Sequence, residues 1–433
     1  MPTARRRNCY HLRGAPRGPP QQVALLPPRP SGWAVKLVLA AGSLALALGA
    51  AEWLLREFLP VRGMIYELDN RYLFRHIPGS RKLATVVGEA WPKVLVRINS
   101  AGRRGDESAL PRAVHRVVVY GDSFVSAEAT PEPETFAAQL TRLLNERTEL
   151  TVVLNAGVTG YGIDQESLRI EDELPRLRPD LVIVAAYAGN DFGDLLRDKL
   201  YRLDDKGRLI TNVPTIDDAL RRDFRAPFEM SSIQIVRALQ SAAEGWAMRR
   251  PGQAASPSAP QDPMAVRLAN RRAEYEDYVL RGDTVVRNLL ADQYDADVSL
   301  EPDSESARYR VRLMARVLER IHQLTERSGA SLLIVIIPER CDVVGDCEVT
   351  QSRRRYPGYR PTGLTDALDS LAHEQGIARL NLFEPFHATG AAGLYHPLDD
   401  HWNPSGQLLA ARLAADMILS SSLLRPAGGS AGR

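Results

Sequence analysis

Five short runs of apolar, largely β-branched residues predict five strands. They are Val117–Tyr120, Thr151–Leu154, Leu181–Ala186, Ser331–Ile337 and Ile377–Leu382. Apolar residues at helical spacing predict helices between these runs. The clearest cover 136–144, 165–174, 314–324 with Gly329 as its end, and 405–419. Continuous apolar runs alternating with amphipathic helices are typical of a parallel sheet covered on both faces.

The third and fourth runs are separated by about 140 residues, far more than one crossover needs. This stretch contains a Pro/Ser/Ala-rich part near Pro251–Pro263 and a charged part around Val266–Leu290 that predicts a helix. We therefore expect a largely helical insertion at about 195–305. Upstream of the first run, residues 56–114 predict one or two short strands packed on the main domain.

The N-terminal region predicts a membrane segment. No charged residue occurs from Leu37 to Ala51, and Trp33 and Trp53 flank this stretch as interfacial aromatics do. Seven bases and no acid precede Glu52, so the positive-inside rule places the N-terminus in the cytoplasm. A cleaved signal peptide is the alternative, because small residues suitable for cleavage follow at Ala45 and Ala47.

The net charge of +2 comes from this basic tail. Removing its 7 bases from the 55 leaves 48 against 53 acids, so the remainder is mildly acidic and predicts no nucleic-acid partner. Cys341 and Cys347 would then lie in an oxidising compartment, where five intervening residues can close a disulfide loop. A zinc site is the less favoured use of this pair, because no second cysteine pair completes four ligands.

Polar residues follow three of the apolar runs directly. They form the blocks Gly121-Asp122-Ser123, Asn155-Ala156-Gly157-Val158-Thr159-Gly160 and Gly189-Asn190-Asp191. A fourth block, His396 to Asn403, precedes the last predicted helix. Ligands bind at the carboxyl edge of open α/β sheets, where these blocks are expected to meet. Each block alone has a plainer interpretation: Ser123 could cap a helix, and Asn190 could be a turn residue.

The order of the four blocks resembles the SGNH/GDSL hydrolase family. The resemblance covers roughly residues 115–420 apart from the insertion, and implies a three-layer α/β/α, flavodoxin-like fold with a five-stranded parallel sheet. It also implies site roles. Ser123 matches the nucleophile, His401 the general base and Asp399 its orienting acid. The backbone N–H groups of Ser123 and Gly160 and the amide of Asn190 match the oxyanion donors. The resemblance implies no metal or organic cofactor.

The chain departs from the family pattern at two places. The leading glycine of the third block falls on Ala188, with Gly189 in the free position. The commonest pattern also has the acid three residues before the histidine, a position that Leu398 occupies here. We assign Asp399, with Asp400 as the alternative, and expect Asp122, Asp191 and Asp400 to support the site. A metal site at His396, Asp399 and His401 is a further alternative.

These observations predict a membrane-anchored serine esterase acting outside the cytoplasm on acyl esters, with envelope glycans or lipids as substrates. One alternative is a polysaccharide O-acetyltransferase with the same triad; the other is a non-catalytic envelope-binding module. The predicted organisation has five parts. They are a disordered cytoplasmic tail (1–32), a transmembrane signal anchor (33–55), the extension (56–114), the hydrolase domain (115–423) and a flexible tail (424–433).

Overall fold

The computed structural model describes residues 32–58, 65–84, 94–107, 115–148, 150–229, 262–290, 294–346 and 355–424, and positions 233, 235, 236 and 239. The chain divides into two compact units, residues 1–53 and 54–433. The predicted tails, the Pro/Ser/Ala-rich stretch up to residue 261 and Cys347 lie outside the described residues.

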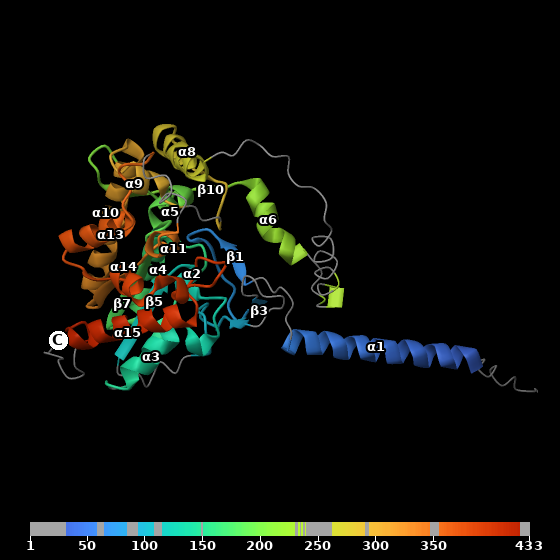
Figure 1. Ribbon diagram of the computed structural model, residues 1–433. Coiled ribbons are helices and arrows are strands. Elements are labelled where there is room, and N and C mark those ends of the chain that lie inside the picture. The colour runs from blue at the N-terminus through green and yellow to red at the C-terminus, as the bar shows by residue number, and fades with distance from the viewer. Residues whose placement is uncertain are drawn as a thin grey trace, which may run out of the picture. The chain divides into compact units, whose positions relative to one another are not determined.

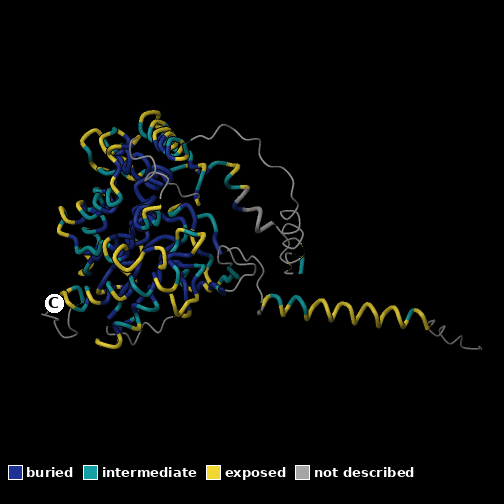
Figure 2. Tube along the Cα trace, viewed as in Figure 1, coloured by how far each residue is buried: buried dark blue, intermediate teal, exposed yellow. Residues whose placement is uncertain are grey.

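Helix α1 (Gly32–Phe58) occupies the predicted membrane segment. Its residues 32–56 are long and apolar enough to cross a membrane, and none of the most apolar stretch is buried (Figure 2). A signal sequence has the same properties, so the two alternatives drawn from the sequence both fit this helix.

The second unit is built on a five-stranded parallel sheet, as predicted (Figure 1). Its strands lie in the order β13-β12-β7-β5-β6. Their bounds are β5 (His115–Gly121), β6 (Thr151–Asn155), β7 (Leu181–Tyr187), β12 (Ser331–Ile337) and β13 (Ala378–Asn381). In chain order this is 2-1-3-4-5, the flavodoxin-like arrangement, in which the order reverses beside the first strand. The carboxyl ends of β5, β6 and β7 are therefore neighbours.

Alternate residues of the strands face two separate hydrophobic cores. Val118 of β5 and Val182 of β7 belong to one core, whereas Val117 and Ile183 belong to the other. Helices α4 (Ile163–Leu177), α10 (Glu305–Ser328) and α13 (Gly363–Glu374) pack in the first core. Helices α3 (Phe136–Asn145) and α15 (Pro404–Ser420) pack in the second. Both faces of the sheet are covered, which explains the continuous apolar runs.

Shorter elements surround the carboxyl edge of the sheet. They are α2 (Ser123–Ser126), η2 (Glu132–Glu134), α5 (Asp191–Asp198), α11 (Arg340–Val344), α14 (Phe383–Thr389) and η4 (Ala391–Leu394). Gly329 ends α10 with a φ of 77°, in the left-handed region where glycine meets no Cβ penalty. The predicted end of this helix is thereby confirmed.

The N-terminal extension contains more strands than predicted. Two antiparallel pairs are present, β1 (Tyr66–Asp69) with β2 (Leu73–His76), and β3 (Arg81–Ala84) with β4 (Val94–Arg97). Each strand has only four residues, too few for a period-2 pattern to stand out in the sequence. Phe74 lies in the first core, and its carbonyl accepts a hydrogen bond of 2.6 Å from the hydroxyl of Tyr161.

The insertion combines helices with short strands. It contains β8 (Tyr201–Leu203), β9 (Leu209–Thr211), β10 (Thr215–Ile216), α6 (Asp218–Glu229), α8 (Pro263–Tyr275), the π-helix η3 (Glu276–Leu280), β11 (Val285–Val286) and α9 (Ala296–Leu300). The helix expected to run to Leu290 ends at Leu280, so that prediction was wrong in its last part. Gly282 adopts a φ of 72° and turns the chain into β11, whose valines favour a strand.

Candidate active site

The nucleophile candidate Ser123 begins α2 directly after β5 and is 7% exposed. Asp122 caps this helix, because its carboxylate accepts a hydrogen bond of 2.8 Å from the backbone N–H of Phe124. A Cβ at Gly121 would lie 2.3 Å from the side chain of Val125, so only glycine permits this tight strand-to-helix turn. The local structure thus explains why glycine stands at position 121 and aspartate at position 122.

His401 and Asp399 form a hydrogen-bonded pair. The Nδ1 atom of His401 lies 2.5 Å from Oδ1 of Asp399, which also accepts the backbone N–H of His401 at 3.1 Å. Burial raises the pKa of Asp399, but the hydrogen bonds and charge of His401 outweigh burial and leave that pKa below its usual value. Of the two acids that the sequence left open, Asp399 makes the bond that fixes the imidazole.

Phe124 connects the histidine loop to the serine turn. Its ring centroid lies 5.0 Å from that of His401 and 5.1 Å from that of Trp402. Asn403 holds the loop in place, since its side-chain amide donates to the carbonyls of Gly393 and Tyr395. The structure therefore brings the first and fourth blocks together, although they are almost 280 residues apart in the sequence.

Gln407 is a part of this connection that sequence reasoning missed. From the first turns of α15 its side chain donates to the carbonyl of Phe124 at 3.2 Å and accepts from the N–H of Phe136 at 2.7 Å. It ties the serine turn to α3 and α15. A glutamine inside an amphipathic helix pattern carries no signal for this role.

The second block forms a tight turn. The N–H of Tyr161 donates to the carbonyl of Val158 at 3.1 Å, and Gly160 stands at the third position with a φ of 82°. A type II turn requires a positive φ there, and glycine is the residue that adopts it readily. The block reaches β5 through the N–H of Val158, which donates to the carbonyl of Gly121 at 3.0 Å.

Asn190 occupies the N-cap of α5, yet its side chain makes no capping hydrogen bond. It is 2% exposed, and both its amide oxygen and its amide nitrogen are buried with no hydrogen-bond partner among the described residues. Buried polar groups are rarely left in this state, and a ligand is one way to satisfy them. Gly189 stands at a position where the family pattern allows any residue. Here it has no room for a side chain, because a Cβ would lie 2.3 Å from Oε2 of Glu339.

Buried carboxyl groups lie behind the serine turn. Asp191 accepts a hydrogen bond of 2.8 Å from the N–H of Tyr187, and burial followed by the charges of Glu166 and Asp122 raises its pKa. Glu166 is 1% exposed, and neither of its carboxyl oxygens has a partner among the described residues. Burial and then the charge of Asp122 raise its pKa well above the usual value. The sequence had pointed to Asp122 and Asp191 but not to Glu166.

The predicted pairing of Cys341 with Cys347 remains a prediction, and the alternative metal site at His396, Asp399 and His401 is not found among the described residues. Cys341 is disulfide-bonded, but Cys347 lies outside the described residues, so the pairing itself is not described. Within the described ranges, no group of three or more His, Cys, Asp or Glu side chains is placed to hold a metal ion.

Several esterase structures resemble this fold. They include the esterase EstA from Pseudoalteromonas sp., with 12% identity, coverage of 71% of this chain and 97% of the esterase, and a TM-score of 0.35. Axe2, an acetylxylan esterase from Geobacillus stearothermophilus, is 12% identical; the match covers 71% of this chain and 94% of Axe2, with a TM-score of 0.36. A lipase/acylhydrolase from Enterococcus faecalis is 12% identical; the match covers 71% of this chain and 96% of that protein, with a TM-score of 0.36. No curated protein matches the chain significantly.

Two family models match the sequence. Residues 119–304 match the GDSL-like lipase/acylhydrolase family. Residues 249–431 match the SGNH hydrolase-like domain of the acetyltransferase AlgX. The two matches overlap within the insertion and together include the Gly-Asp-Ser block and the histidine loop. They show that this chain belongs to the SGNH/GDSL hydrolase family.

Proposed function

We propose that this protein is a serine-dependent hydrolase of acyl esters, with Ser123 as nucleophile, His401 as general base and Asp399 as orienting acid. The family supports an acyl esterase or acyltransferase. The observation that carries the proposal is the His401–Asp399 pair, packed through Phe124 against the serine turn. A serine hydroxyl needs a neighbouring imidazole to accept its proton, and a carboxylate to hold that imidazole in the correct tautomer.

In the proposed reaction Nε2 of His401 takes the proton of the Ser123 hydroxyl, and Oγ attacks the ester carbonyl. The N–H groups of Ser123 and Gly160 and the amide of Asn190 then donate to the oxyanion. His401 returns the proton to the leaving alcohol as the carbonyl re-forms, which leaves an acyl-enzyme. Water, activated by the same histidine, releases the acid and regenerates Ser123.

For the substrate, we propose O-acyl groups of envelope glycans or lipids. Helix α1 supports this choice, because an uncleaved apolar helix at Gly32–Arg56 would hold the enzyme at the membrane. The basic residues that precede it favour an orientation with the N-terminus inside and the catalytic domain outside.

Labelling with a fluorophosphonate probe tests the nucleophile in the full chain in detergent. We expect labelling that disappears in Ser123→Ala and weakens strongly in His401→Ala. Ser126→Ala is the matched control: this serine is 1% exposed, lies in the same short helix and bonds the Thr159 hydroxyl at 2.7 Å. Unlabelled wild-type protein would support the non-catalytic binding module. Loss of labelling in Ser126→Ala alone would refute Ser123 as the nucleophile.

A second candidate function is O-acetyl transfer to a polysaccharide. It is favoured by the match of residues 249–431 to the AlgX domain and by the Asp-x-His spacing of Asp399 and His401. The chemistry is the same up to the acyl-enzyme, after which a sugar hydroxyl replaces water. Incubating the protein with p-nitrophenyl acetate, with and without acetyl-free oligosaccharides, separates the two. Acetylated sugar in excess of free acetate would favour transfer over hydrolysis.

A further inference from the structure

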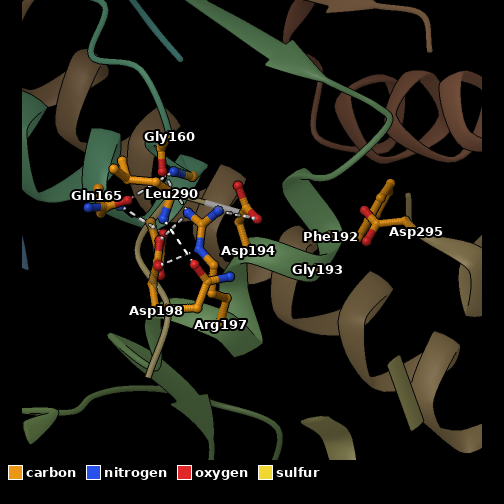
Figure 3. Close-up of polar contacts among 12 residues, drawn as sticks. Gly160, Gln165, Phe192, Gly193, Asp194, Arg197, Asp198, Leu290 and Asp295 are labelled. Carbon is orange, nitrogen blue, oxygen red and sulfur yellow. Dashed lines mark hydrogen bonds and ion pairs between the residues drawn. The ribbon is translucent and has the colours of Figure 1, made fainter. Parts of the chain in front are cut away.

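Arg197 is a buried arginine near the end of α5, and carboxylates hold it on two sides (Figure 3). Its side chain is 4% exposed. Nη1 lies 2.8 Å from Oδ1 of Asp194, while Nε and Nη2 contact the two oxygens of Asp198 at 2.8 and 3.1 Å. A bidentate pair of this kind fixes the plane of a guanidinium as well as its position. Two carboxylates also compensate its charge, so the group is stable in this buried place.

A further contact of Nη2 is with the second polar block. This nitrogen donates to the backbone carbonyl of Gly160 at 2.6 Å. The carbonyl belongs to the peptide that follows Gly160, whereas the proposed oxyanion donor is the N–H on the other side of the same Cα. Only the φ and ψ angles of Gly160 connect the two groups. A fixed carbonyl therefore determines the direction of the N–H when both angles are held; the observed φ is 82°.

Glycine needs such a restraint because it lacks a Cβ and occupies several backbone conformations at little cost. The insertion restrains it from another side. A Cβ at Gly160 would lie 2.9 Å from Cδ2 of Leu290 and 3.2 Å from the carbonyl oxygen of Leu289. Gly160 is thus confined by Leu290 and Leu289 of the insertion and by Arg197 of α5.

Helix α5 connects this restraint to the other proposed donor. The helix has eight residues and begins directly after Asn190, its N-cap. Gly193 and Asp194 both donate backbone hydrogen bonds to the carbonyl of Asn190, at 2.8 and 2.9 Å. One rigid helical segment therefore carries Asn190 at its start and Arg197 at its end. Arg197 joins that segment to the turn of Gly160.

We propose that Arg197 is a positioning residue that joins the Gly160 turn to α5, so that two of the three proposed oxyanion donors, those of Gly160 and Asn190, move as one unit. The inference rests on the proposed function, since it concerns the same oxyanion. Preorganised donors stabilise a transition state more than a bound substrate, so loosening them lowers kcat with little change in KM.

Arg197→Lys in the full chain tests the proposal, because lysine retains the charge but cannot form the fork. With p-nitrophenyl acetate we expect kcat to fall by about 10- to 100-fold. This fall is no larger than the one expected when a complete oxyanion donor is removed. KM should change by no more than about twofold, the pattern of an interaction made only in the transition state. The affinity for phenylboronic acid, which forms a tetrahedral adduct on the serine, should fall with kcat/KM.

Arg169→Lys is the matched control. Arg169 is also buried and donates to a backbone carbonyl of the same loop, that of Ala156, at 2.7 Å, but Ala156 carries no proposed donor. We expect this variant to retain kcat. If both variants lose kcat in proportion to their losses of folding stability, general loosening of the loop explains the effect and the proposal is overturned.

A double-mutant cycle tests the coupling between the donors. If Arg197 aligns Gly160 with Asn190, Arg197→Lys should lose much less activity in an Asn190→Ala background than in the wild type. Equal losses in both backgrounds would contradict the proposed unit. If Arg197→Lys does not fold, Asp198→Asn weakens the same fork while leaving Arg197 in place, and the same kcat loss is expected on a smaller scale.

The proposed function and this inference fail in different ways. Wild-type protein without fluorophosphonate labelling at Ser123 would refute the function. Normal labelling and activity in the wild type, together with full kcat in Arg197→Lys and Asp198→Asn, would refute the role of Arg197 alone.

Discussion

Replacing Asn190 with leucine should make the protein less active and more stable at the same time. Leucine has nearly the shape of asparagine but no polar atoms. In the free enzyme the Asn190 amide is buried without a hydrogen-bond partner among the described residues, and its side chain does not cap α5. No described residue therefore loses a hydrogen bond when the amide is removed.

The magnitudes follow from that geometry. A buried polar group left unsatisfied costs about 1–3 kcal/mol, and an apolar group of the same shape avoids this cost. We expect Asn190→Leu to raise the free energy of unfolding by up to about this amount. In the reaction the same amide would donate to the oxyanion, and loss of one such donor lowers kcat by about 10²–10³.

Asn155→Leu is the matched control. Asn155 is also buried, but its amide donates to the carbonyl of Val125 at 2.7 Å and accepts the N–H of Gly157 at 3.0 Å. Removing this amide takes a hydrogen bond from the carbonyl of Val125 and from the N–H of Gly157. We therefore expect Asn155→Leu to destabilise the protein, whereas Asn190→Leu stabilises it. Urea denaturation monitored by tryptophan fluorescence gives the unfolding free energies, and ester hydrolysis gives kcat.

The reasoning is refuted by either of two results. If Asn190→Leu destabilises the protein as much as Asn155→Leu does, then the amide of Asn190 is bonded in the free enzyme. If Asn190→Leu is stable but retains full kcat, this amide is not an oxyanion donor. Only the combination of increased stability with strongly reduced turnover agrees with the geometry.

Three further predictions concern the acid, the pH dependence and the serine turn. Asp399→Asn should lower kcat by about 10⁴, as loss of the correct imidazole tautomer does in serine proteases, whereas Asp400→Asn should change kcat little; steady-state kinetics decides between them. Burial, followed by the charge of Glu339, raises the pKa of Asp342 to about 8. The folded state therefore keeps this proton at pH values where the unfolded chain has lost it. The contribution of this carboxyl to the free energy of unfolding is fully present below about pH 4 and falls by at most about 1.4 kcal/mol per pH unit up to about pH 8. Urea denaturation between pH 5 and 8 should show this slope, and Asp342→Asn should flatten it. Gly157→Ala places a Cβ 2.4 Å from the backbone nitrogen of Ser126, so it should destabilise the fold by about 1–3 kcal/mol and lower kcat by displacing α2; calorimetry and ester hydrolysis measure the two effects.

The sheet could be predicted from the sequence because four of its strands, β5, β6, β7 and β12, are mostly buried on both faces. Such strands consist of continuous apolar residues and end sharply at polar ones, so Leu181–Ala186 alone predicted nearly the whole of β7 (Leu181–Tyr187). The insertion could not be read in this way. Its strands have two or three residues, as in β11, and their positions depend on contacts with other elements instead of on local periodicity.

The residues that hold the site in place were not predictable, because their partners are backbone atoms far away in the sequence. Gln407 bonds the carbonyl of Phe124 across 283 positions, and Arg197 bonds that of Gly160 across 37. A carbonyl acceptor exists at every residue, so it leaves no pattern in a sequence. The motif residues were found because glycine, aspartate, serine and histidine are chemically restricted at their positions.

The insertion contacts the loops of the proposed site directly. Leu290 confines Gly160, and the backbone N–H of Asp295 donates to the carbonyl of Gly189 at 2.8 Å, next to Asn190. The same part of the insertion thus contacts the loops of two proposed oxyanion donors, Gly160 and Asn190. These contacts restrain the backbone of the two loops. Substitutions in this part of the insertion should therefore alter kcat as well as the choice of substrate.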